Sequence, residues 1–455
     1  MRMRALGRTA AATALALAAS LLTSSGAQSA DYVVRNPGFV VPASPTAHFN
    51  NPRIGTPDET GRINNQLIDL IDHAAPGTTI TGSMFSFTDN AVADALVHAS
   101  KNGVKIRLVL DSSALPVPAM DWLAPQNTDP AKNPPPAQVP PVEVNPYSEF
   151  PKLLRQLGAD RTKDSFVYAC PRFRGCIGGR PAAEIGKNPI NHNKYFLFEK
   201  VGAVDDVVFQ SSANLTGVQM TKYFNNAVTV PSRQLYTAYE GYFRDQLAYS
   251  TDADGEPDYH RLSAQPRAAG AYTAYFSPRR EAGADFREDP ATDTALDILA
   301  PVNCTSGTKI RVGMYAFTRY QIADRLVALR EAGCDVYVFV NDEKDEVGDK
   351  ARARLLDGGL NLVANCYVAP SADPEKKVVG LHSKYLLIEG TYEDRPNRAL
   401  VFTGSQNYTY PSLRGYDETI LKIDDKAVYN AFEHNFDDVL SGSGQKAGPC
   451  KPMTK

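Results

Sequence analysis

The sequence has little of several features that would place it in a simple class. It holds one tryptophan, seven histidines and six cysteines among 455 residues, and its formal net charge is −3. This balance excludes a chain that is basic overall, such as a general nucleic-acid coat protein. The cysteines do not repeat as closely spaced pairs, which argues against a structural zinc site. Because 43% of the residues are hydrophobic and 22% are charged, the composition is still that of a globular protein.

No apolar run reaches the roughly 20 residues that a membrane-spanning helix needs. An apolar run at residues 9–22 follows three arginines and precedes a series of small residues. This order is typical of a secretory signal peptide, and a membrane anchor is the alternative. We expect residues 1–30 to be removed and the protein to be secreted. Their removal takes away three arginines and no acid, so the net charge changes from −3 to −6.

An even number of cysteines in a secreted chain is typical of disulfide bonds. Cys170 and Cys176 are close enough in sequence to close a small loop. The pairing of the other four, Cys304, Cys334, Cys366 and Cys450, does not follow from their spacing.

An internal duplication is the strongest organisational signal. Residues 80–111 and 310–341 align without a gap at an offset of 230. Each copy predicts a strand, then an amphipathic helix that ends near Gly103 or Gly333, then a second strand that ends at Asp111 or Asn341. This is the strand–helix–strand crossover of an α/β sheet.

The duplication predicts the fold class: an α/β protein with two similar α/β/α-type halves and mixed, largely parallel sheets. We place the first half at residues 31–250 and the second at residues 271–455, with a polar linker at 251–270. A proline-rich insert at about 112–150 cannot form a helix or a central strand. We expect it to be a surface loop over the core, and it carries the single tryptophan, Trp122.

The same set of polar residues occurs once in each half. It consists of His192, Lys194, Ser212 and Asn214 in the first half, and of His382, Lys384, Ser405 and Asn407 in the second. Residues two apart on a strand share a face, so each histidine points the same way as its lysine. One such pair would be an ordinary half-buried histidine on an amphipathic strand. Its recurrence, each time followed by Ser-x-Asn, favours a functional site.

This set of side chains suits phosphoryl transfer. A neutral imidazole can attack phosphorus, and an imidazolium can protonate the leaving oxygen. Two lysines and two asparagine amides can bind the non-bridging oxygens and offset charge in the transition state. The set requires no metal or other cofactor, and no cluster of acids and histidines with metal-ligand spacing accompanies it.

At these residues the sequence resembles the phospholipase D superfamily. The family signature is His-x-Lys-x4-Asp followed by Gly/Ser-Ser-x-Asn, in two copies. The matching segments are HNKYFLFE with SSAN and HSKYLLIE with GSQN, with Glu199 and Glu389 in place of the usual aspartates. In the family this acid supports local structure. The resemblance implies two halves that pack about a pseudo-two-fold axis and share one site.

The resemblance also implies roles for the residues of the site. His192 is expected to become a phosphohistidine, and His382 is expected to act as acid and then as base. The lysines and asparagines would stabilise the phosphoryl oxygens, and Ser212 and Ser405 are expected to bind substrate.

A single carboxylate breaks the symmetry of the two motifs. Glu418 follows Asn407 by eleven residues, whereas the matching stretch of the first half has Asn225 and Asn226. A carboxylate partner stabilises an imidazolium and fixes its tautomer. We expect Glu418 to hold His382 and to raise its pKa, which favours His192 as the nucleophile. The alternative is an ordinary surface acid at the end of a strand.

The sequence therefore predicts a secreted phosphodiesterase of the phospholipase D type. It would hydrolyse the headgroup phosphodiester of phospholipids at a membrane or micelle surface, and it would also be able to transfer the phosphatidyl group to alcohols. The alternatives are a secreted nuclease with the same site, and an inactive lipid- or phosphate-binding protein. The negative charge disfavours nucleic acid, although a basic cluster precedes the first motif at Arg172, Arg174, Arg180 and Lys187. We expect a monomer, because one chain supplies both motifs.

Overall fold

The structure is a computed structural model. It describes residues 32–115, 147–252, 254–256, 258–262, 266–279, 293–305, 307–341, 346–364, 366–367, 378–441 and 451–452. The expected signal peptide, Trp122 and most of the proline-rich insert lie outside these residues. Residues Arg35–Lys455 form one compact unit, which holds both halves of the duplication. None of the described helices is long and apolar enough to cross a membrane.

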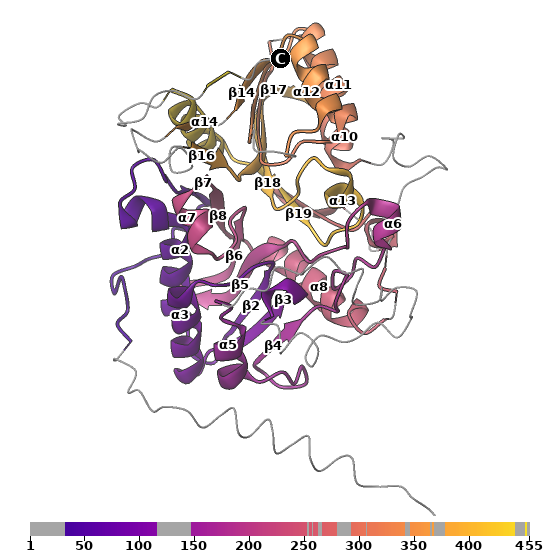
Figure 1. The fold of residues 1–455 in the computed structure, drawn as a ribbon. Coiled ribbons are helices and arrows are strands. Elements are labelled where there is room, and N and C mark those ends of the chain that lie inside the picture. Colours follow the sequence, from indigo (N-terminus) through magenta and orange to yellow (C-terminus); the bar gives the residue numbers. More distant parts are fainter. Residues whose placement is uncertain are drawn as a thin grey trace, which may run out of the picture. The chain divides into compact units, whose positions relative to one another are not determined.

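The first half is built on a seven-stranded sheet of order β1-β8-β6-β5-β2-β3-β4 (Figure 1). Its strands are β1 (Thr46–Phe49), β2 (Thr79–Met84), β3 (Lys105–Leu110), β4 (Phe166–Ala169), β5 (Lys194–Val201), β6 (Val204–Ser211) and β8 (Asn226–Pro231). The predicted crossover is confirmed as β2, α3 (Asn90–Lys101) and β3.

The second half repeats this plan in a ten-stranded sheet of order β20-β14-β13-β12-β17-β18-β19-β10-β9, with β11 paired to β17. Its strands are β9 (Arg267–Ala269), β10 (Tyr272–Phe276), β11 (Val302–Asn303), β12 (Lys309–Met314), β13 (Asp335–Val340), β14 (Asn361–Ala364), β17 (Lys384–Tyr392), β18 (Arg395–Gly404), β19 (Thr419–Asp424) and β20 (Lys451–Pro452). The crossover is β12, α11 (Tyr320–Glu331) and β13.

The two sheets are mixed, as predicted, but the prediction that they are largely parallel is wrong. Only β2-β3-β4 and β12-β13-β14 pair in parallel among their described strands. The strands that begin at Lys194 and Lys384 pair antiparallel with β2 and β12. Two-residue turns then lead from β5 to β6 and from β17 to β18. So short a connection can join only antiparallel strands, because a parallel pair needs a crossover of a dozen residues or more.

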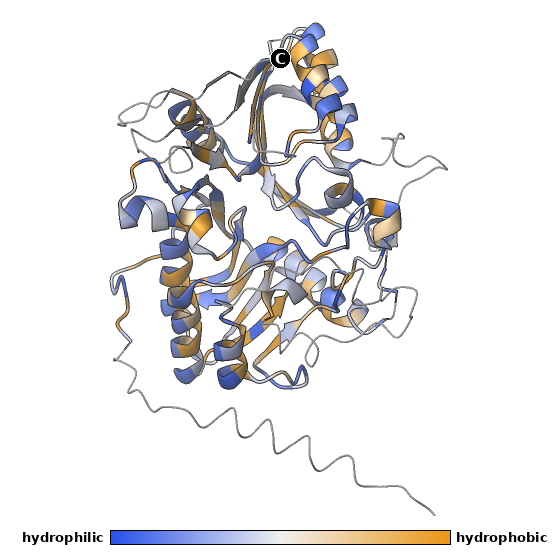
Figure 2. Cartoon of the chain, in the orientation of Figure 1, coloured by the Kyte–Doolittle hydropathy of each residue, from blue (hydrophilic) through white to orange (hydrophobic). Residues whose placement is uncertain are grey.

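The helices pack against these sheets in three groups. α2 (Pro57–Asp72), α3 and α5 (Phe150–Leu157) pack together in the first half, and α10 (Thr294–Leu299), α11 and α12 (Asp349–Asp357) in the second. α8 (Arg233–Tyr249) contacts β6 and β10, and α14 (Lys426–Ser441) contacts β18 and β1, so each touches both halves. α2 buries Ile63, Leu67 and Leu70, and Figure 2 shows the mixture of hydrophilic and hydrophobic residues expected of amphipathic helices.

Short elements connect the larger ones. They are η1 (Ser112–Ala114), α6 (Ala182–Ile185), α7 (Gly217–Thr221), α9 (Tyr259–Leu262), α13 (Tyr410–Arg414), β7 (Tyr223–Phe224), β15 (Cys366–Tyr367) and β16 (Val378–Leu381). β7 of the first half pairs in parallel with β16 of the second. This pairing links the backbones of the two halves next to the second His-x-Lys motif.

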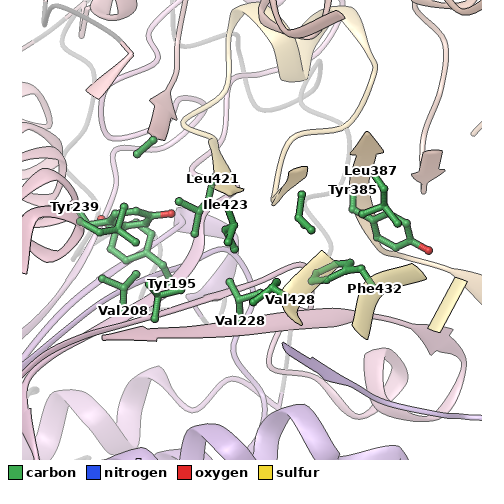
Figure 3. Packing of buried hydrophobic residues seen from close by; sticks show 14 of the residues in the cluster. Tyr195, Val208, Val228, Tyr239, Tyr385, Leu387, Leu421, Ile423, Val428 and Phe432 are labelled. Carbon is green, nitrogen blue, oxygen red and sulfur yellow. The ribbon is translucent and has the colours of Figure 1, made fainter. Parts of the chain in front are cut away.

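A single hydrophobic core continues from one half into the other. It includes Tyr195, Val208 and Tyr239 of the first half, and Leu421 and Phe432 of the second (Figure 3). Each fully buried side chain of this size contributes roughly 1.5–3 kcal/mol to the hydrophobic stabilisation. This cluster therefore contributes hydrophobic stabilisation across the junction of the halves as well as within them.

Two disulfide bonds lie in the described part of the chain. The predicted Cys170–Cys176 bond is present, and a second bond joins Cys304 to Cys334. Cys366 begins β15, and Cys450 lies outside the described residues.

The shared core predicts cooperative unfolding. The ring of Phe432 in α14 is fully buried and packs edge-on against Phe49 of β1, with ring centroids 4.9 Å apart. We expect Phe432→Ala to lower the free energy of unfolding by about 3–5 kcal/mol. Denaturant unfolding followed by circular dichroism should show one transition for the wild type and one for Phe432→Ala. Two separate transitions in the wild type would contradict a core shared by the halves.

Candidate active site

The histidine of each His-x-Lys motif is hydrogen-bonded through its backbone N–H to the opposite half. The N–H of His192 donates to the carbonyl of Asp417 over 3.0 Å, and the N–H of His382 donates to the carbonyl of Phe224 over 2.8 Å. These contacts continue a bridge between Asn191 and Asp417 and the pairing of β7 with β16. The two motifs, 190 residues apart in sequence, are thereby held at one junction.

The side-chain partners of the histidines are also exchanged between the halves. Nδ1 of His192 lies 2.9 and 3.0 Å from the two carboxylate oxygens of Glu418, which belongs to the second half. Nδ1 of His382 lies 3.0 Å from Oδ1 of Asn225, which belongs to the first half. Glu418 and Asn225 occupy equivalent places in the repeat, eleven residues after Asn407 and Asn214.

The prediction that Glu418 holds His382 is therefore wrong, since Glu418 holds His192. The segment after each Ser-x-Asn motif crosses the junction before its partner residue. The carboxylate consequently reaches the histidine of the other motif, and sequence proximity within one half pointed to the wrong ring.

Further hydrogen bonds orient these partners. The amide nitrogen of Asn225 donates to the carbonyls of Gln219 and Tyr223, at 3.0 and 3.4 Å, so its oxygen faces the ring of His382. A hydrogen bond to Oδ1 of Asn225 requires the proton on Nδ1 of His382, and the tautomer with that proton leaves Nε2 as the basic nitrogen.

The two predicted substrate-binding serines contact the histidine partners. The hydroxyl of Ser212 donates to Oδ1 of Asn225 over 3.1 Å, and that of Ser405 is hydrogen-bonded to Glu418. The Ser212 hydroxyl also accepts from the N–H of Asn226, and the Ser405 hydroxyl from that of Thr419, both at 3.0 Å. These contacts allow both serines to position the partners of the histidines, and substrate binding by the two serines stays a prediction.

The two lysines are buried beside their histidines. Nζ of Lys194 donates to the carbonyl of His192, and Nζ of Lys384 to that of His382, both over 2.6 Å. Nζ of Lys384 also lies 2.9 Å from Nδ1 of His382. Each ammonium position faces an aromatic ring, at 5.3 Å from the centroid of Phe85 and 4.9 Å from that of Tyr315. The ring faces favour positive charge at both positions.

The two asparagines of the Ser-x-Asn motifs differ in their contacts. Oδ1 of Asn407 accepts from the N–H of Ala316 over 3.3 Å. Oδ1 of Asn214 is buried and has no hydrogen-bond partner within the described residues. An amide in this state can turn toward a ligand without breaking a bond to the protein.

Burial lowers the pKa values of the basic groups in the site. It lowers the pKa of His192 to about 4, although Glu418 acts to raise it. The pKa of His382 falls well below its usual value because of burial and the two lysines. Burial also lowers the pKa of Lys194 to about 7 and that of Lys384 far below its ordinary range. Charges of the other motif contribute to the pKa shift of each histidine, so the four groups share one site. Burial favours the neutral form of both imidazoles.

The carboxylate of Glu418 stays ionised in this setting. Burial acts to raise its pKa, but His192 and Lys194 outweigh burial and leave the pKa below the usual value. The result is a neutral imidazole that donates its Nδ1 proton to a carboxylate and presents Nε2 as a nucleophile.

Asp111 and Asn341 were predicted only as the ends of strands. Both lie next to the His-x-Lys motifs. Oδ2 of Asp111 accepts from the N–H of Asn191 over 2.8 Å, and Oδ1 of Asn341 accepts from the N–H of Leu381 over 3.1 Å. Each therefore holds the residue that precedes a histidine. Their matched positions in the repeat, an acid opposite an amide, were the available signal.

The position of the acids makes the site asymmetric. Burial raises the pKa of Asp111 to about 6, and Lys194 acts in the opposite direction. Both Asp111 and Glu418 raise the pKa of Lys194. The first motif thus has two buried acids, at positions where the second motif has Asn341 and Asn225.

Two other groups singled out in the sequence lie in structural positions. Glu199 accepts from the N–H of Thr79 over 2.9 Å, and Glu389 forms ion pairs with Lys309 and Lys426. Both acids therefore support local structure, as expected. In the basic cluster, the Arg174 side chain is buried and donates to the carbonyls of Tyr249 and Asp252.

The amino-acid sequence of this chain matches a known protein family. Residues 67–247 and 303–440 match the family described as "Cardiolipin synthase, PLD-like domain". No curated protein sequence matches the chain.

Solved structures resemble this chain to different degrees, and the one with a TM-score above 0.5 supports a shared fold. Phosphatidylserine synthase from Haemophilus influenzae Rd KW20 is 13% identical, with a TM-score of 0.53 over 87% of this chain and 86% of that one. Polyphosphate kinase from Porphyromonas gingivalis is 10% identical, with a TM-score of 0.46, and the match covers 87% of this chain but 50% of the kinase. The phospholipase D family member Nuc from Salmonella typhimurium is 19% identical, with a TM-score of 0.27 over 45% of this chain and 95% of Nuc.

The family match covers more than half of the chain and includes both His-x-Lys motifs. With the duplicated α/β fold and the paired motifs at one junction, it shows that the chain is a member of the phospholipase D superfamily with a duplicated domain.

Proposed function

We propose that this chain is a secreted phosphodiesterase that hydrolyses the headgroup phosphodiester of phospholipids through a phosphohistidine. The observation that carries the proposal is the pair of buried, neutral imidazoles whose Nδ1 atoms are held across the junction by Glu418 and Asn225. Because both rings use Nδ1 for these contacts, Nε2 is the nitrogen that each offers to a two-step displacement at phosphorus.

In the first step, Nε2 of His192 attacks phosphorus and the bond to the leaving oxygen breaks. Positive charge develops on the attacking ring, and the carboxylate of Glu418 stabilises it through Nδ1. His382 donates a proton to the leaving oxygen. The negative charge of a bound phosphodiester raises the pKa of His382 and so favours this proton on the ring.

In the second step, His382 takes a proton from water while the water oxygen attacks phosphorus. The phosphorus–nitrogen bond breaks, and His192 returns to its neutral form. An alcohol in place of water yields a new phosphodiester by the same route. Lys194, Lys384, Asn214 and Asn407 bind the non-bridging oxygens in both steps.

The contacts of Glu418 support His192 as the nucleophile for a new reason. The ring of the nucleophile stays positively charged throughout the lifetime of the phospho-enzyme, while His382 is neutral, and an ionised partner stabilises that charge. His382 only gains and loses a proton, and the neutral Asn225 fixes its tautomer while its pKa follows the substrate. The assignment made from the sequence is kept, although its original basis was wrong.

The substrate class rests on charge and on the family description. The net charge of −3, or −6 without residues 1–30, gives no long-range attraction to nucleic acid. The description of the matching family names a phospholipid synthase, which supports a phosphatidyl group as the substrate. Two disulfide bonds are compatible with an oxidising compartment, and one chain holds both motifs, so we propose a secreted monomer that acts at a lipid surface.

A parallel assay tests this function. The purified protein is incubated with phosphatidylcholine vesicles, with and without ethanol, and separately with plasmid and single-stranded DNA in EDTA. Release of choline with intact DNA supports the proposal, and phosphatidylethanol in the ethanol samples shows transfer. Cleavage of DNA without release of choline would replace the proposal with a nuclease.

The roles of the two histidines predict different intermediates. His192→Ala and His382→Ala should each abolish turnover, because each ring takes part in both steps. Rapid quenching with a labelled substrate should trap a phospho-enzyme in the wild type and none in His192→Ala. Peptide mapping that finds the label on His382 would reverse the assignment.

The carboxylate on His192 predicts a large effect of one charge. Glu418→Gln keeps the size of the side chain and should lower kcat roughly 10²–10³-fold, as the loss of one transition-state stabiliser does. The matched variant Asn225→Asp gives His382 a carboxylate, which raises its pKa and should move the fall of activity with pH to higher pH. If Glu418→Gln keeps kcat within about threefold, Glu418 does not stabilise the nucleophile.

Asp111 predicts a shift of the pH profile. Its negative charge raises the pKa of Lys194, so Asp111→Asn should lower that pKa below about 7. Activity that needs the Lys194 ammonium is lost as the pH rises through this pKa, and the variant should lose it at lower pH. The measurement is kcat/KM against pH, with Asn341→Asp as the matched control beside the other motif. An unchanged profile in Asp111→Asn would show that the carboxylate acts only as a hydrogen-bond acceptor.

A further inference from the structure

We propose that Asp417, together with the loop closed by the Cys170–Cys176 disulfide, is a positioning clamp that holds Glu418 on His192. This inference rests on the proposed function of the site and names two elements outside the His, Lys and Asn motifs. The clamp is defined as Asp417 and residues 170–178.

The clamp is built across the junction of the halves. The carboxylate of Asp417 is fully buried and accepts from the N–H groups of Ile177 and Gly178, over 3.0 and 2.6 Å. Cys176, which directly precedes them, is bonded to Cys170 six residues earlier. A loop of the first half therefore encloses a side chain of the second.

The loop lies directly on the backbone that carries Glu418. A Cβ atom on Gly175 would come within 2.6 Å of Oδ1 of Asp417, and one on Gly178 within 2.1 Å of the carbonyl oxygen of Gly415. Both separations are far below van der Waals contact. These two positions therefore require glycine because of close approach, and the contact leaves no room for residues 415–417 to shift toward the loop.

The backbone of Asp417 is hydrogen-bonded to the segment that carries His192, the proposed nucleophile. Its carbonyl accepts from the N–H of His192, and its own N–H donates to the carbonyl of Ile190, both over 3.0 Å. The next residue, Glu418, binds Nδ1 of the His192 ring. Two consecutive residues thus hold both the backbone and the ring of His192, and the loop holds the first of them.

Among the described residues, no such clamp is present at the second motif. Phe224 occupies the place in the repeat that corresponds to Asp417, one residue before Asn225. Its carbonyl accepts from the N–H of His382 as that of Asp417 does for His192, but its side chain is a buried phenyl ring. The backbone bridge alone therefore needs no carboxylate. Within the part of the chain that the structure describes, the extra contacts belong to the histidine that Glu418 holds.

Burial of a carboxylate costs desolvation free energy, so a contribution to stability alone does not explain its presence here. Burial raises the pKa of Asp417 to about 7, although the N–H donors and Arg174 act to lower it. An apolar residue, as at Phe224, avoids that cost. The charged side chain is explained by the two directed hydrogen bonds, which an apolar side chain cannot make.

The test compares the two disulfide bonds of the described chain. Cys170→Ser/Cys176→Ser removes the bond of the clamp, and Cys304→Ser/Cys334→Ser is the matched control, since that bond joins the segment after β11 to the residue before β13. We expect the first variant to lower kcat about 10–100-fold with KM little changed, as small misplacements of catalytic groups do. The control should keep kcat within about twofold, although both variants lose thermal stability.

A double-mutant cycle shows whether the clamp acts through Glu418. In a Glu418→Gln background, removal of the Cys170–Cys176 bond should cause no further loss of kcat, because the group it positions is already disabled. Additive losses would overturn the proposal. So would equal losses of kcat in the two disulfide variants, or no loss in the first.

A second variant and a second measurement keep the test independent of folding yield and of substrate. Asp417→Asn keeps the shape of the side chain and one acceptor oxygen, and it should show the same loss of kcat to a smaller degree. By NMR, the Nδ1 proton of His192, identified by its absence in His192→Ala, should exchange faster in both clamp variants but not in the control. If the wild type hydrolyses no phosphodiester, the proposed function fails, and the NMR result still decides whether the clamp holds the ring. An unchanged proton signal would overturn the clamp.

Discussion

The exchange of hydrogen bonds between the halves is the constraint on which the site depends. Each half supplies a histidine and also the residue that orients the histidine of the other half, Glu418 for His192 and Asn225 for His382. Neither half contains a complete catalytic unit. The core around Phe432 and Tyr239 keeps the halves together, so hydrophobic burial stabilises the contacts on which the chemistry relies.

The distribution of buried basic and acidic side chains is the second property on which the site depends. Four basic side chains are buried at the junction. Glu418 and Asp111 raise the pKa of Lys194, whereas Glu418 and Glu346 raise that of Lys384. Burial keeps the imidazoles neutral, which a nucleophile requires. In the proposed mechanism, a phosphodiester brings the negative charge that raises the pKa of His382 and of the lysines. That mechanism therefore couples substrate binding to protonation of the proposed general acid.

Much of the fold could be predicted because the sequence contains an internal duplication. The offset of 230 between the strand–helix–strand units located both crossovers, and the repeated His-x-Lys and Ser-x-Asn motifs located the side chains of the proposed site. The parallel character of the sheets was overestimated, because short turns such as the one from Val201 to Val204 impose antiparallel pairing on the other strands. A repeat reveals its own elements but not how strands from different elements are paired.

The sequence by itself determined the residue types, their duplication and the chemistry that they can perform. Only the tertiary structure decided which residue acts on which, because that depends on contacts between segments about 160–230 residues apart. The chain crosses the junction after each Ser-x-Asn motif. Glu418 is therefore hydrogen-bonded to His192, and the loop closed by the disulfide donates to the carboxylate of Asp417. Such pairings follow from the packing of the two halves, which no local pattern of residues encodes.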